Sequence, residues 1–138
     1  MPPATAYVND SIGTAGPAQL VLALYDGALG AIERARILLE TPARPPGSES
    51  GAGRAHGSTP GSVETVHTQL VKAQRIVTEL RVTLDHERGG DIARNLDALY
   101  GFCLRTLVDA NLTKDPSRLT PAFDVLRSLR DTWAQACC

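Results

Sequence analysis

The sequence predicts an all-α protein, an antiparallel four-helix bundle with a short N-terminal arm and a long flexible loop between its first two helices. Apolar residues recur at spacings of three and four along most of the 138 residues, as they do on one face of a helix. We find no convincing run of alternating apolar and polar residues, which is the pattern of a half-buried strand. The length suits one domain, with the arm at 1–16, the bundle at 17–138 and the loop at 41–62.

The first predicted helix begins at Pro17 and ends near Glu40. Proline has a fixed φ that suits the first helical position, and Gly16 before it is a tolerated N-cap. The apolar stripe of this helix is wider than a single packing seam requires. It consists of Leu20, Leu24, Ala28, Ile32, Ala35 and Leu39, and is widened by Val21, Tyr25 and Leu29.

Residues 41–62 are mostly Pro, Gly, Ser, Ala and Thr, so this segment has nothing to bury and we expect a mobile loop. A loop of this length is either functional or a tolerated surface insertion, and we favour the insertion. The second helix is expected from residue 62 to residue 88, where Gly89 and Gly90 supply a stop. Its seam consists of Val63, Val66, Leu70, Ala73, Val77, Leu80 and Leu84.

The third helix is expected from residue 91 to residue 112. Its seam consists of Ile92, Leu96, Leu99, Cys103, Leu107 and Ala110, broadened by Tyr100 and Leu104. Pro116 and Pro121 each follow an N-capping residue, and we favour a last helix that starts at Thr120, because a start at Pro116 would put Pro121 deeper inside it. The last helix buries Ala122, Phe123, Leu126, Leu129 and Trp133.

The composition narrows the class of protein. The chain has 14 Lys and Arg against 15 Asp and Glu, a net charge of −1, which disfavours nucleic acid as a partner. No apolar run is long enough to insert into a membrane, and we expect a cytosolic protein. Three cysteines agree with a reducing compartment. Cys103 reads as a buried apolar residue, and we expect Cys137 and Cys138 to lie at a frayed end, with metal binding or cross-linking as less favoured roles.

No group of residues indicates catalysis or a cofactor. Glu64 and His67 have the spacing of two metal ligands on one helical face, but the second copy of this motif that a di-iron bundle needs is missing. His86 lies beside Asp85 without a nucleophile nearby, so it reads as a solvated residue. We therefore predict no enzyme, no metal and no cofactor.

Asp26 and Gly27 interrupt an otherwise apolar helix. A glycine inside a helix costs about 1 kcal/mol relative to alanine, and Gly30 adds a second such cost. Either these small residues allow a neighbouring helix to approach closely, or they leave a groove for a partner while Asp26 stays free to accept hydrogen bonds. Both interpretations remain open from the sequence.

Three blocks of sequence resemble the flagellin-specific export chaperones of the FliS family. They are TAGPAQLVLALYDGAL at 14–29, GGDIARNLDALYGFCLRTLVDAN at 89–111 and VLRSLRDTWAQA at 125–136, and Tyr7 is similar to a tyrosine near the family's N-terminus. The chain departs from the family pattern at Gly16, where a serine cap is usual, at Gly101, where a polar or acidic residue is commoner, and in its long loop.

The resemblance implies a cytosolic chaperone that binds the C-terminal segment of flagellin, prevents premature polymerisation and aids delivery to the flagellar type III export apparatus. An export-gate protein and a weak homodimer are further candidate partners. The resemblance also implies a flagellin groove, or residues that support one, formed by Tyr7, Tyr25, Asp26, Gly27, Asn95, Leu99, Tyr100, Arg105, Leu107 and Asn111.

Two alternatives to this binding surface stay open. Leu99 and Leu107 fit a plain core equally well, and Asn95 and Asn111 could cap or cross-link helices, since buried amides usually have hydrogen-bond partners. A self-associating bundle, in which the surplus apolar faces pair with a second copy, is the alternative function.

Overall fold

The computed structural model describes residues 16–41 and 63–138, and these form four α-helices and one short 3-10 helix. The helices are α2 (Pro17–Glu40), α3 (Val63–Val82), α4 (His86–Thr113) and α5 (Thr120–Cys137), with the 3-10 helix η2 (Pro116–Leu119) before α5. The all-α prediction is confirmed. All of the predicted arm except Gly16, and so Tyr7, and all of the predicted loop except Thr41 lie outside the described residues.

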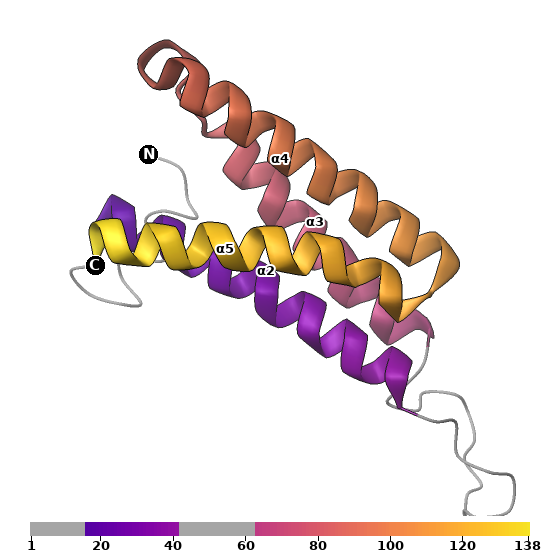
Figure 1. The fold of residues 1–138 in the computed structure, drawn as a ribbon. Helices are drawn as coiled ribbons and strands as arrows, with labels where there is room; N and C mark the ends of the chain where they lie inside the picture. The colour runs from indigo at the N-terminus through magenta and orange to yellow at the C-terminus, as the bar shows by residue number, and fades with distance from the viewer. Residues whose placement is uncertain (1–15, 42–62) are drawn as a thin grey trace, which may run out of the picture.

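Successive helices run in opposite directions (Figure 1). Helix α2 packs beside α3 and α5, and α4 packs beside the same two helices, so α2 and α4 lie diagonally across the bundle. The apolar faces meet in one core because each helix presents most of its seam inward. The predicted seam residues Val63 and Ile92 are exceptions, since they are 64% and 70% exposed. Its largest fully buried side chains are Ile32, Leu70, Leu107, Leu119, Leu126, Val66, Val77 and Cys103. None of the helices within the described ranges is both long and apolar enough to cross a membrane.

The junction between α3 and α4 differs from the sequence prediction. Helix α3 ends at Val82 and not at residue 88, and α4 begins at His86. The Asp85 side chain accepts a hydrogen bond from the Arg88 backbone N–H at 3.1 Å, so it caps a new helix before the two glycines are reached. Gly90 has φ of 51° and ψ of −123°, which kinks α4 near its start instead of ending α3.

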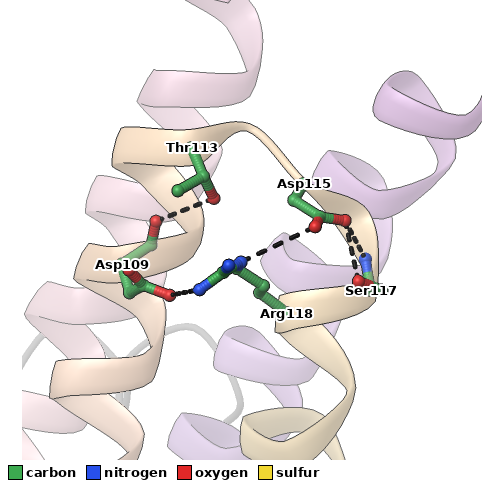
Figure 2. Close-up of polar contacts among 5 residues, drawn as sticks. All are labelled: Asp109, Thr113, Asp115, Ser117 and Arg118. Atoms are coloured by element: carbon green, nitrogen blue, oxygen red, sulfur yellow. Dashed lines mark hydrogen bonds and ion pairs between the residues drawn. The ribbon is translucent and has the colours of Figure 1, made fainter.

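The connection between α4 and α5 is short and held by charged side chains (Figure 2). Arg118 Nη1 lies 2.6 Å from Asp109 Oδ2, and Arg118 Nε lies 3.6 Å from Asp115 Oδ2. Asp115 caps η2 by accepting hydrogen bonds from the backbone N–H and the hydroxyl of Ser117. Helix α5 begins at Thr120, as predicted, because η2 uses Pro116 at its own start and leaves Pro121 in the first turn of α5.

The three cysteines are of two kinds. Cys103 is fully buried, as predicted, and burial raises the pKa of its thiol to about 11. Helix α5 continues through Cys137, so the predicted frayed end is wrong. Cys137 and Cys138 form a disulfide with each other, which connects no two helices.

Candidate partner-binding surface

Two of the predicted site residues, Tyr25 and Tyr100, meet in the core. Each is 2% exposed, and their hydroxyl oxygens lie 2.6 Å apart, one donating and the other accepting a hydrogen bond. They come from the diagonal pair α2 and α4, so the bond reaches across the centre of the bundle. Burial raises the pKa of both phenols, and the bond to Tyr25 raises that of Tyr100 further. These tyrosines hold helices together and do not form a surface.

Asp26 is exposed and forms an ion pair with α5. Its Oδ1 lies 2.8 Å from Arg130 Nε of α5, and Arg130 Nη1 lies 3.2 Å from Asp131. Asp26 therefore already accepts a hydrogen bond from α5, and its side chain stays 52% exposed, so acceptance of a further hydrogen bond from a partner stays a hypothesis. The pair links α2 to α5 on the surface of the bundle, where solvent reduces its strength.

The two glycines of α2 have different environments. A Cβ on Gly27 would lie 3.2 Å from Ile76 Cδ1 of α3, which is a tight contact, so Gly27 permits close approach of the two helices. A Cβ on Gly30 would meet only the Arg34 side chain of the same helix, 3.5 Å away. The close-packing interpretation therefore explains Gly27, whereas nothing in the structure explains Gly30.

The predicted residues of α4 divide between the core and the surface. Leu107 is fully buried and belongs to the core. Asn111 is half-buried. Its side-chain nitrogen Nδ2 lies 2.9 Å from His67 Nδ1, and its side-chain oxygen Oδ1 accepts a hydrogen bond from Lys114 Nζ at 2.8 Å. Asn111 therefore cross-links α4 to α3, and His67 is engaged there. Asn95 and Arg105 are exposed, and Leu99 is 36% exposed.

One face of α4 carries apolar side chains that the other described helices leave partly exposed. Ile92 is 70% exposed and Phe102 is 37% exposed, and the spacing of 92, 95, 99 and 102 places these residues on one side of the helix. We call Ile92, Asn95, Leu99 and Phe102 the α4 stripe. The structure therefore brings Asn95 and Leu99 of the predicted site together and adds two residues that sequence reasoning did not select.

The α4 stripe continues into a shallow depression of about 300 Å³ between α4 and α5. Leu99, Val125 and Leu129 supply its apolar lining, and Asp124 and Ser128 supply polar groups. Phe102 could have been recognised from the sequence, because it lies three residues beyond Leu99 and off the predicted seam. Val125 gave no such signal, since its exposure depends on how closely α5 packs against α4.

Among the described residues, no three His, Cys, Asp or Glu side chains gather as a potential metal site. The arrangement has no activated nucleophile or acid–base pair either. Its chemistry is that of an apolar surface with a polar margin, which is suited to holding another chain.

Comparison with known proteins agrees with a surface that binds another chain. A model of a protein family described as "Flagellar protein FliS" matches residues 1–138. The chain is 33% identical over 129 residues to the flagellar secretion chaperone FliS of Salmonella typhimurium, which covers 93% of this chain and 82% of that protein. It is also 31% identical over 134 residues to the FliS chaperone of Bacillus subtilis, which covers 97% of this chain and 85% of that protein.

Proposed function

Because the chain belongs to the FliS family of flagellar proteins, we propose that it is a cytosolic export chaperone that binds the C-terminal region of flagellin. In this function it prevents premature polymerisation of flagellin and aids its delivery to the flagellar type III export apparatus. The observation that best supports the proposal is the exposed α4 stripe and the depression beside it, because an isolated bundle gains nothing from large apolar side chains in water.

Binding at this surface needs a partner that is itself apolar along one face. A disordered segment can form an amphipathic helix as it docks, covering Leu99 and Phe102 while its polar face stays in water. Such coupled folding buries roughly 1,000 to 3,000 Å² and loses part of the interaction energy to ordering. An export chaperone benefits from this mode, because the segment unfolds again on release.

The predicted site residues take three roles in this proposal. Leu99 contacts the partner directly, and Asn95 offers its amide to the partner's backbone or side chains. Tyr25, Gly27, Tyr100 and Leu107 act from within the core, since they fix the position of α4 relative to α2 and α3. Asp26 and Asn111 fix the surface links between helices.

Calorimetric titration with the C-terminal segment of flagellin from the same organism tests the proposal. We expect one-to-one binding with a large negative heat-capacity change, together with a gain of helix by circular dichroism. No binding by the full chain or by a chain lacking the arm would contradict it.

A pair of variants tests the surface itself. Leu99→Ser combined with Phe102→Ser should weaken flagellin binding by about tenfold or more, because central apolar contacts usually dominate an interface. Ile37→Ser is the matched control, since Ile37 is 53% exposed on α2 and lies outside the α4 stripe. Equal affinity of the double variant and the wild type, with both folded, would exclude the α4 stripe.

The arm at 1–16, which carries Tyr7, is proposed to occupy the same surface and to be displaced by flagellin. Its point of attachment supports this, because Trp133 Nε1 of α5 donates a hydrogen bond to Ala18 O at 2.8 Å and thereby fixes the start of α2 beside α5. Deleting the residues before Thr14 should tighten or accelerate flagellin binding. Unchanged affinity and rate would show that the arm does not compete.

Self-association is the second candidate, because the α4 stripe could equally pair with a second copy of itself. Sedimentation across a range of concentrations separates the two functions, since a stable dimer covers the stripe before flagellin arrives. Contact with an export-gate protein is a further proposal. A pull-down that compares the free chaperone with its flagellin complex tests it.

A further inference from the structure

A second feature of α4 lies around Gly101, on the flank that faces α3. A Cβ on Gly101 would have Arg105 Nη1 at 3.5 Å and both terminal nitrogens of Arg81 at 3.5 Å as its nearest neighbours. Gly101 is buried, although it has no side chain of its own to cover. Two guanidinium groups from different helices therefore lie beside each other over one glycine.

The charges of these two groups are only partly balanced. Arg81 Nε lies 2.7 Å from Asp97 Oδ1, which leaves the terminal nitrogens of Arg81 directed toward Gly101. Arg105 makes no ion pair with any of the described residues, whereas the neighbouring arginine on α4, Arg94, is paired with Asp91. Two adjacent cations balanced by only one carboxylate attract a further anion.

The shape of a guanidinium group selects the kind of anion. Its parallel N–H donors match the two oxygens of a carboxylate, and two such groups can hold one carboxylate from both sides. Because Gly101 carries no side chain, only the helix backbone lies beneath the two guanidinium groups at this position.

The same flank of α4 offers apolar contacts next to the arginines. Val108 is 44% exposed and Leu112 is 79% exposed, and they follow Arg105 by three and seven residues on the same side of the helix. A free inorganic anion gains nothing from these two side chains, whereas a peptide that carries both a carboxylate and apolar residues does.

We propose that Arg81 and Arg105 over Gly101 form a binding site for a carboxylate on an acidic, partly apolar segment of a protein partner, with Val108 and Leu112 completing the contact. This surface lies on the α3-facing flank of α4 and is separate from the α4 stripe. The proposal does not depend on flagellin binding, since the site is defined by charge and geometry in the free chain.

Two helical probe peptides test the proposal on the full chain labelled with ¹⁵N-arginine. Both contain leucines spaced by three and four residues, and they differ only in one position, which is glutamate in the first and glutamine in the second. We expect the glutamate peptide to shift the side-chain Nε–Hε signals of Arg81 and Arg105 and to bind about threefold more tightly, as for an exposed ion pair. Equal binding of the two peptides would overturn the proposal.

Variants of the chain make the test specific. Arg105→Gln should remove the preference for glutamate, whereas Arg94→Gln, the matched control on the same helix, should retain it. Gly101→Asp places a carboxylate under both arginines, because the backbone of α4 is helical there. It should also abolish the preference, and an unchanged preference in Gly101→Asp or Arg105→Gln would contradict the proposed site.

A titration with inorganic phosphate completes the test. We expect phosphate to shift the two arginine signals only at much higher concentration than the glutamate peptide. Equal potency of phosphate would assign the site to a free oxyanion and would overturn the inference of a partner segment.

Discussion

Helices α2 and α4 have the same kind of sequence but opposite environments. Both have more apolar width than one seam requires, yet the only large apolar side chain strongly exposed on α2 is Ile37, whereas α4 exposes Ile92, Leu99, Phe102, Val108 and Leu112. On α2 the wide face is built partly from alanines and glycine, which let α3 approach closely. On α4 the outer part of this face is built from large side chains that the neighbouring helices cover only in part. Residue size therefore separates the closely packed face of α2 from the partly exposed apolar face of α4.

The largest expected change in stability comes from comparing a substitution on the buried side of α4 with one on its exposed side. Leu107→Ala should lower the free energy of unfolding by about 3 kcal/mol, because it opens a cavity in the core. Leu112→Ala, five residues along the same helix, should change it by less than about 0.5 kcal/mol. Urea denaturation measures both values, and similar losses in the two variants would refute the division of α4 into core and surface sides.

The link between α2 and α4 can be broken without changing the shape of the core. Tyr100→Phe removes one hydroxyl and leaves that of Tyr25 buried without its partner, so we expect a loss of about 1 kcal/mol in unfolding free energy. Replacing both tyrosines by phenylalanine should cost less than the two single changes together. Strictly additive losses would mean that the two hydroxyls do not interact in solution.

The glycines of α2 sharpen the comparison further. Gly30→Ala should stabilise the protein by about 0.5 to 1 kcal/mol, because alanine favours the helix and the new methyl group meets only a flexible arginine. Gly27→Ala should gain less, since the methyl group must displace Ile76. Thermal unfolding of the two variants gives the order, and a larger gain at Gly27 would contradict its role in close packing.

The smallest expected change in stability is the one caused by acid, and the pKa of Asp97 on α4 determines its direction. The hydrogen bond from Arg81 holds the pKa of Asp97 below its ordinary value near 4. The stabilisation is therefore complete above that ordinary value and is lost as the pH falls through the lower pKa of the folded state. The free energy of unfolding, measured between neutral and acidic pH, should depend slightly less on pH in Asp97→Asn than in the wild type. An identical dependence would show that Asp97 does not contribute to it.

The sequence was sufficient for the helices and for most of the core, because the spacing of apolar residues and the prolines at helix starts are local signals. It was misleading at Gly89 and Gly90, because the competing cap from Asp85 starts α4 before these glycines are reached. The binding surface was less predictable, because exposure depends on packing between distant segments. Leu99 and Leu107 belong to the same predicted seam, yet Leu107 is fully buried and Leu99 is 36% exposed, a difference that depends on tertiary packing and not on local spacing.

The hydrogen bond from Trp133 to Ala18 has a practical consequence, because Trp133 is the single tryptophan of the chain. Its indole lies half-buried where α5 meets the first turn of α2, so its fluorescence reports on that end of the bundle alone. Movement of the segment that precedes α2 should change the emission wavelength or the quenching of this one fluorophore. Stopped-flow mixing could then time events at this end of the molecule without any attached dye.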